Sequence, residues 1–168
     1  TDVSGFKESL NNQNYKKKKI FILGAGGVTP SVVFCFLNSA EKIYISNRTK
    51  KKAEEIKRLF SKKNQIEIVN WGEKKETCDI VVNTTSVGLK NNEKLDLDFM
   101  NYKGKDDVLF YDIIYNPEET DFLKKAKLRG NNIMNGKMMF LMQAQNAFKI
   151  WTGISPKIDD ESIKLLSL

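Results

Sequence analysis

The chain has 168 residues, enough for one α/β domain with its own hydrophobic core. Apolar residues make up 40% of it, as in ordinary globular proteins, and no stretch is long and apolar enough to span a bilayer. Neither a signal peptide nor a metal-ligand spacing is visible. We therefore predict a cytoplasmic protein with no membrane partner and no metal site, in which Cys35 and Cys78 are reduced core thiols.

The net charge is +7, with lysine runs at residues 16–19, 50–52 and 124–127. This charge raises the question of nucleic-acid binding. The lysines lie beside acidic residues or at the ends of predicted elements, and no aromatic residues alternate with them. We therefore predict solvated lysines and no nucleic-acid partner, with part of the charge serving an anionic cofactor. The chain has no histidine, so the commonest general acid–base residue is unavailable.

The first predicted element is a short helix over residues 2–10. Asp2 or Ser4 is the expected cap, and Phe6 and Leu10 fall on one face. The polar residues that follow end this helix.

Next comes a strand, a glycine turn, a helix and a second strand. The apolar residues 19–23 predict a buried parallel strand, and Gly24-Ala25-Gly26-Gly27 follows directly. Pro30 fits the first turn of a helix over residues 31–38, and residues 43–46 predict the next strand. A helix N-terminus beside a glycine turn presents free N–H groups to a phosphate, which is typical of dinucleotide-binding units. A tight turn in some other α/β protein is the alternative.

The end of the second strand indicates which dinucleotide is bound. NAD sites usually carry an acid about 20 residues beyond the glycines, but Ser46-Asn47-Arg48-Thr49 contains no carboxylate. Arg48 offers a planar fork suited to phosphate, and Lys52 adds a charge one helical turn later. This pattern favours a 2′-phosphate and hence NADP(H). A solvated basic helix start is the alternative.

The rest of the chain alternates helices and strands. Further helices are predicted at residues 49–62, with Thr49 as cap and Ala53, Ile56, Leu59 and Phe60 apolar, at 121–129, at 137–151 and from Asp159 or Asp160 to 168. Further strands are predicted at residues 66–69, 79–83, 108–112 and 132–134. A turn or partial helix is expected at 71–77, and a polar connection with apolar Leu95, Leu97 and Phe99 at 90–105. This alternation predicts an α/β fold with a doubly wound parallel sheet of order 3-2-1-4-5-6, a Rossmann-like three-layer α/β/α arrangement.

Hydroxyl side chains follow the fourth predicted strand, in Asn83-Thr84-Thr85-Ser86-Val87-Gly88. Open α/β sheets bind ligands at this carboxyl edge, where such groups suit ribose or phosphate. A hydroxyl-capped loop without a ligand is the alternative.

Taken in order, these motifs resemble the C-terminal, NADP-binding domain of the shikimate dehydrogenase family over nearly the whole chain. The matching stretches are Thr1-Asp2 with Gly5-Phe6, Gly24 to Gly27, Asn47 to Thr49, Asn83 to Gly88, Tyr111-Asp112 through Tyr115-Asn116-Pro117 to Thr120, and Gly136, Met139, Gln143-Ala144, Phe148 and Trp151-Thr152-Gly153. The last two stretches are the most specific. Glutamyl-tRNA reductase has a similar glycine turn and Asn-Arg-Thr stretch but is not known for this ending.

The resemblance implies that the whole enzyme reduces 3-dehydroshikimate to shikimate with NADPH, in aromatic amino-acid synthesis. Asp2 matches the family's catalytic aspartate, and Asp2, Tyr115 and Gln143 match substrate-binding positions. The catalytic lysine belongs to the family's N-terminal substrate domain, so we expect residues 1–168 to be a single NADP-binding domain, inactive alone, with a C-terminal helix within 154–168. The positions that match cofactor contacts are Gly24, Ala25, Gly26, Gly27 and Val28 at the pyrophosphate, Asn47, Arg48, Thr49 and Lys52 at the 2′-phosphate, and Thr85, Ser86, Val87, Ile113, Gly136 and Met139 at the nicotinamide.

The sequence departs from the family pattern at two places. Several of its residues, and its function, also have alternative interpretations. Thr29-Pro30 replaces small, often basic residues, which implies an altered entry into the helix. Lys52 stands where arginine is common and lacks its bidentate fork, which implies weaker cofactor binding. Without the resemblance, we would interpret Asp2 as a helix cap, Gln143 as an exposed polar residue and Met139 as a residue that fills the core. A quinate/shikimate dehydrogenase, another NADP-dependent oxidoreductase, and a non-catalytic nucleotide- or nucleic-acid-binding module are the alternative functions. A monomer or a homodimer is expected.

Overall fold

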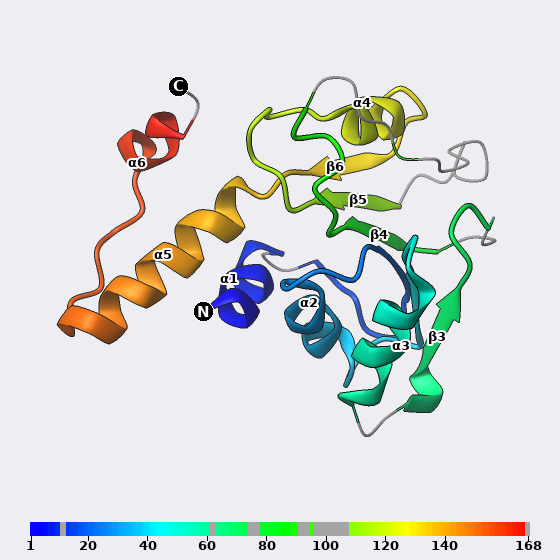
Figure 1. Ribbon diagram of the computed structural model, residues 1–168. Coiled ribbons are helices and arrows are strands. Elements are labelled where there is room, and N and C mark those ends of the chain that lie inside the picture. Colours follow the sequence, from blue (N-terminus) through cyan, green and yellow to red (C-terminus); the bar gives the residue numbers. More distant parts are fainter. Residues whose placement is uncertain (11–12, 61–62, 74–77, 91–94, 96–107, 167–168) are drawn as a thin grey trace.

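The protein is built on one six-stranded sheet (Figure 1). The computed structural model describes residues 1–10, 13–60, 63–73, 78–90, 95 and 108–166. The strands are β1 (Lys19–Leu23), β2 (Lys42–Ser46), β3 (Ile66–Val69), β4 (Ile80–Asn83), β5 (Leu109–Asp112) and β6 (Asn132–Met134). They pair in the order β3-β2-β1-β4-β5-β6, and each pairing is parallel. The predicted fold class and strand order are confirmed.

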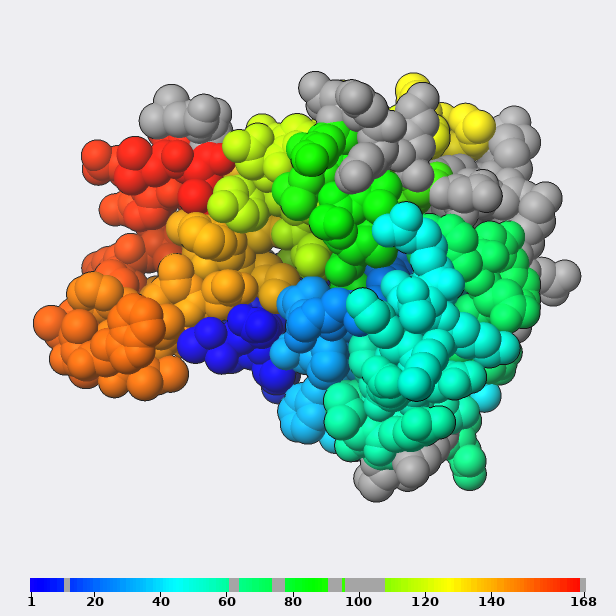
Figure 2. Space-filling view, in the orientation of Figure 1, coloured from blue at the N-terminus to red at the C-terminus, as the bar shows by residue number. Residues whose placement is uncertain are grey.

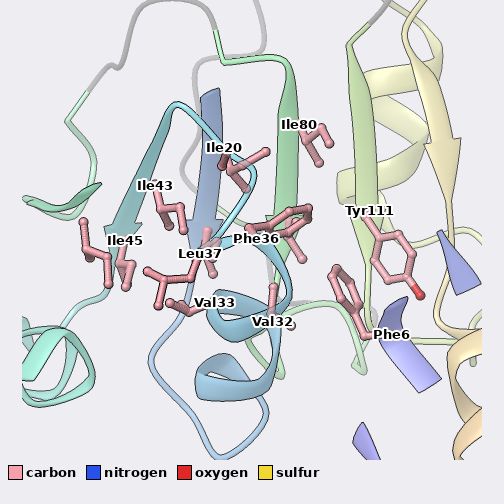
Figure 3. Close-up of a cluster of buried hydrophobic side chains, with 14 of the residues drawn as sticks. Phe6, Ile20, Val32, Val33, Phe36, Leu37, Ile43, Ile45, Ile80 and Tyr111 are labelled. Carbon is pink, nitrogen blue, oxygen red and sulfur yellow. The ribbon is translucent and has the colours of Figure 1, made fainter. Parts of the chain in front are cut away.

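Two hydrophobic clusters lie on opposite faces of this sheet. Ile20 and Ile22 of β1 belong to one cluster and Phe21 to the other, because successive side chains of a strand point to opposite faces. The helices that cover the first face are α1 (Asp2–Ser9), α2 (Thr29–Phe36), α3 (Lys50–Arg58) and α5 (Lys137–Thr152), and α4 (Asp121–Lys127) covers the second. In Figure 3, Phe36 of α2 points onto Ile20 and its neighbours. The predicted three-layer arrangement is therefore confirmed.

Several helix ends differ from the prediction. Helices α2, α3 and α4 end at Phe36, Arg58 and Lys127, before the predicted residues 38, 62 and 129. Leu59 was expected on the apolar face of α3, yet it follows the last helical residue and is 69% exposed. Apolar periodicity therefore continues beyond the point at which this helix stops covering the sheet.

The predicted caps are partly wrong. Asp2 and Ser4 both lie inside α1, whose N-cap position is Thr1, and the Ser4 hydroxyl donates to the Thr1 carbonyl over 2.9 Å. Thr49 does hold the N-cap position of α3, but its side chain makes no capping hydrogen bond. Asp159 caps α6 (Asp160–Leu165) as predicted, because its carboxylate accepts from the Ser162 amide over 2.9 Å.

Helix α1 is anchored between the sheet and α5. Phe6 packs against Tyr111 with ring centroids 5.0 Å apart, as Figure 3 shows, and Tyr111 and Ser9 share a hydrogen bond of 2.7 Å between their hydroxyls. On the other side, a Cβ built on Gly5 would lie 2.9 Å from the Cβ of Gln143. The two helices thus touch closely, so α1 holds its N-terminus against α5.

The second half of α5 extends away from the sheet (Figures 1 and 2). Gly153 ends this helix in the left-handed conformation, and the last helical residue is Thr152, one residue beyond the predicted end at residue 151. Trp151 is 81% exposed, and Phe148, Ile150 and Ile154, close to it in sequence, are exposed as well. No helix in the described part of the chain is long and apolar enough to cross a membrane.

The remaining predictions concern single residues. Cys78 is buried as expected, whereas Cys35 is only half-buried, and burial raises the pKa of its thiol to about 11. Leu95 joins the second hydrophobic cluster. Its predicted neighbours Leu97 and Phe99, and most of the predicted turn at 71–77, lie outside the described residues.

Candidate functional site

The glycine turn between β1 and α2 forms the first wall of the site. Gly24 has a φ of +112°, and a Cβ there would lie 2.6 Å from the Thr84 hydroxyl, so only glycine fits. Thr84 donates this hydroxyl to the Leu23 carbonyl over 2.8 Å and therefore accepts from Thr29, 2.9 Å away. The fully buried Thr29, which departs from the usual fingerprint, thus joins the turn to the loop after β4.

A cavity of about 340 Å³ opens beside this turn, at the carboxyl edge of the sheet. It is lined by Gly24, Ala25, Gly26, Asn47, Arg48, Thr49, Lys52, Trp71, Thr84, Thr85, Ser86 and Val87. All of these except Trp71 and Thr84 are predicted cofactor residues, so the structure brings together three stretches that are distant in sequence. No carboxylate is among these lining residues. The predicted Gly27 and Val28 belong to the same turn but do not line the cavity.

A second cavity of about 410 Å³ continues along the same edge. It shares Thr84, Thr85 and Ser86 with the first, and its other lining residues are Leu89, Ile113, Ile114, Tyr115 and Asn116. The Tyr115 ring lies against Phe140 of α5, with centroids 4.8 Å apart. The predicted Ile113 and Tyr115 therefore belong to this more apolar half of the site.

Asp112, the last residue of β5, is a buried carboxylate that hydrogen-bonds to the end of β4 and to the segment between β5 and α4. It accepts hydrogen bonds from the Thr120 hydroxyl (2.6 Å), the Asn83 amide group (3.0 Å) and the Ile114 backbone N–H (3.1 Å). Burial raises the pKa of Asp112 to about 6, although these three hydrogen bonds act in the opposite direction. Because Asn83 ends β4 whereas Ile114 and Thr120 lie between β5 and α4, Asp112 joins these two segments, and Ile114 lines the second cavity.

The other predicted residues surround these cavities without lining them. Gly136 packs closely on the loop that follows β5. A Cβ built on Gly136 would lie 1.9 Å from the Ile113 carbonyl oxygen. Met139 is buried in the core, as the alternative interpretation had it. Asp2 and Gln143 lie on the touching helices α1 and α5, and neither lines the two cavities.

Trp71 and Thr84 are lining residues that were not predicted as cofactor contacts. Thr84 lies in the predicted hydroxyl loop, but Trp71 was assigned only to a polar turn. A usable signal was present, because Trp71 comes two residues after the end of β3, and the site is built from residues that directly follow strands. Among the described side chains, no three His, Cys, Asp or Glu residues gather as they would around a metal ion.

A glycine turn at a helix N-terminus, hydroxyl groups and a guanidinium meet at the carboxyl edge of a doubly wound sheet. Free backbone N–H groups and a planar cation are suited to phosphates. Fold and site together define the class of dinucleotide-binding domains.

The chain belongs to the shikimate / quinate 5-dehydrogenase family, whose family model matches residues 7–134. A relative named shikimate dehydrogenase (NADP(+)), from Pelagibacter ubique, is 48% identical over 100% of this chain and 62% of its own length. A solved shikimate dehydrogenase in complex with NADP⁺ is 30% identical, with a TM-score of 0.83 over 99% of this chain and 58% of its own. A 5-ketofructose reductase from a Gluconobacter strain is also 30% identical, with a TM-score of 0.82 over 99% of this chain and 62% of its own. The chain thus spans less than two thirds of these relatives.

Proposed function

We propose that this chain is the NADP-binding part of a shikimate dehydrogenase, which reduces 3-dehydroshikimate to shikimate with NADPH. The observation that carries the proposal is the first cavity, where a glycine turn faces Arg48 and Lys52 and no carboxylate follows β2. A site for NAD would usually place an acid there to accept from the ribose 2′-OH. The relative named as NADP(+)-dependent and the solved complex with NADP⁺ support the same cofactor.

We assign different groups of residues along the sheet edge to different parts of NADP(H). We assign the pyrophosphate to the turn of residues 24–28, whose backbone lines the first cavity at Gly24, Ala25 and Gly26. Asn47, Arg48, Thr49 and Lys52 would hold the 2′-phosphate. Residues 85–87 and Ile113 would hold the nicotinamide, and the resemblance adds Gly136, which packs on Ile113, and Met139 to this part of the site. When bound, NADPH supplies the hydride for the ring ketone.

The substrate-facing residues are proposed from the resemblance together with their position. Tyr115 lines the second cavity and packs against Phe140 of α5, and Asp2 and Gln143 lie on the paired helices α1 and α5. Asp2 is the proposed catalytic acid–base residue, and Tyr115 and Gln143 hydrogen-bond substrate hydroxyls. The catalytic lysine is assigned to a substrate domain other than residues 1–168, so these residues bind NADP(H) but do not turn over substrate.

Calorimetry with NADP⁺ and NAD⁺, followed by an NADPH absorbance assay with shikimate, tests the proposal. We expect these residues to bind NADP⁺ more tightly than NAD⁺ and to show no turnover. Equal affinity for the two cofactors would refute the assignment of the 2′-phosphate site. Clear turnover would refute the need for a separate substrate domain.

A second candidate is an oxidoreductase of the same family with another substrate. The family model covers quinate as well as shikimate enzymes, and the similar 5-ketofructose reductase bears a different activity in its name. Kinetics of the full-length protein with shikimate, quinate and 5-ketofructose distinguish these substrates. We further propose that the enzyme is cytoplasmic, acts in chorismate and aromatic amino-acid biosynthesis, and is a monomer or a homodimer.

A further inference from the structure

Trp71 occupies the corner of a four-residue turn directly after β3. The Glu73 amide donates to the Asn70 carbonyl over 3.1 Å and closes the turn. Gly72, the third residue, has a φ of +79°, the sign that a type II turn requires at that position. Trp71 is therefore presented at a defined corner.

Asn70 ties this turn to the end of β2. The Ser46 hydroxyl donates to the Asn70 carbonyl and the Lys50 ammonium to the Asn70 side-chain oxygen, each over 3.2 Å. The Asn70 amide groups in turn donate to the Glu73 carboxylate, at 3.3 and 3.1 Å. Since Ser46 and Lys50 flank the stretch that carries Arg48, these bonds hold the turn beside Arg48.

The Trp71 side chain bridges the core and the first cavity. It is half-buried and packs against the hydrophobic cluster that contains Val69 and Leu23, and it also lines the cavity with Arg48 and Lys52. Cations and backbone N–H groups of this cavity are sufficient to bind the phosphates of a dinucleotide, so phosphate binding does not require an aromatic side chain. An indole adds a flat apolar surface, which suits the flat face of a purine base.

We propose that Trp71 binds the adenine of NADP(H) by stacking of the indole on the base. The inference rests on the proposed function, because it names the group that the base of the cofactor contacts. Arg48 would then bind the 2′-phosphate of the same adenosine. The Asn70 hydrogen bonds to Ser46 and Lys50 hold Trp71 and Arg48 on the same cavity, as binding of one adenosine by both residues requires.

Tryptophan fluorescence makes the proposal directly testable, since Trp71 and Trp151 are the two tryptophans of the chain. Trp151 is 81% exposed on the part of α5 that leaves the sheet, so Trp151→Phe isolates the signal of Trp71. In this variant we expect adenosine 2′,5′-bisphosphate to quench the fluorescence saturably and nicotinamide mononucleotide to leave it unchanged. An unchanged signal at bisphosphate concentrations that calorimetry shows to be saturating would overturn the proposal.

Substitution of Trp71 supplies the second measurement. Trp71→Leu should weaken the bisphosphate by about 5- to 150-fold, the range for one lost base–aromatic stack, whereas Trp71→Phe should retain most of the affinity. Trp151→Leu is the matched control and should bind as the unsubstituted chain does, with circular dichroism showing that each variant is folded. Equal affinity of the Leu and Phe variants would overturn the stacking role. Absence of bisphosphate binding to the unsubstituted chain would instead refute the proposed function itself.

Discussion

Removal of the Arg48 guanidinium should lower the affinity for NADP⁺ and leave the affinity for NAD⁺ nearly unchanged. Arg48 lines the first cavity directly after β2 and is exposed to solvent. A hydrogen bond between charged groups contributes about 1.5–3 kcal/mol, and solvent exposure puts Arg48 at the lower end. We therefore expect Arg48→Ala to weaken NADP⁺ binding by about 1.5–2 kcal/mol, or roughly 10- to 30-fold, while NAD⁺ affinity stays nearly constant.

Calorimetric titration with both cofactors at fixed ionic strength measures the effect. Lys51→Ala is the matched control, because it removes a positive charge from an exposed neighbour on α3 that does not line the cavity. This control should change NADP⁺ affinity by only a few tenths of a kcal/mol, since charges separated by solvent are screened. An equal loss for NADP⁺ and NAD⁺, or an equal loss in the two variants, would show that Arg48 does not contact the 2′-phosphate.

Three further predictions concern the scaffold of the site, and chemical denaturation checks each. Asp112 keeps its proton in the folded state up to a pH of about 6, whereas its ordinary pKa is 3.8, so its contribution to the unfolding free energy falls as pH rises through this window. Asp112→Asn should abolish this fall, which amounts to at most about 3 kcal/mol, and parallel pH profiles of the two proteins would contradict it. Gly136→Ala should cost about 3 kcal/mol because its Cβ meets the Ile113 carbonyl, while Gly27→Ala, which has open space within 4 Å, should be nearly neutral. Thr29→Val should cost about 1 kcal/mol through the lost hydrogen bond to Thr84, and unchanged stability would show that this bond contributes nothing.

Strand positions were predictable, whereas the C-terminal ends of helices α2, α3 and α4 were not. Buried parallel strands are continuous apolar runs, so residues 19–23 were predicted with the bounds that the structure has. Residues 66–69 and 132–134 were also predicted with the observed bounds, although these strands are only partly buried. Helix ends depend on where a helix stops covering the sheet, which periodicity does not encode. Leu59 continued the apolar pattern of α3 and is nevertheless exposed.

The first cavity was largely predictable for a topological reason. In a parallel sheet the residues that follow each strand meet at one edge, so the stretches after β1, β2 and β4 had to converge. The stretch after β3 obeys the same rule, but its residues resemble an ordinary polar turn. Trp71 was missed because its direction depends on the Asn70 hydrogen bonds to β2 and α3.

The order of strands and helices, the glycine turn and the basic stretch without a carboxylate follow from the amino-acid sequence alone. These features are local, and the period of apolar residues and the turn residues encode them directly. The hydrogen bonds of Thr29 with Thr84, of Asn83 with Asp112 and of Tyr111 with Ser9, 102 residues away, depend instead on the folded arrangement of the whole chain. Such pairs form where packed elements bring distant side chains within about 3 Å, and that approach is set by the whole core rather than by any one segment.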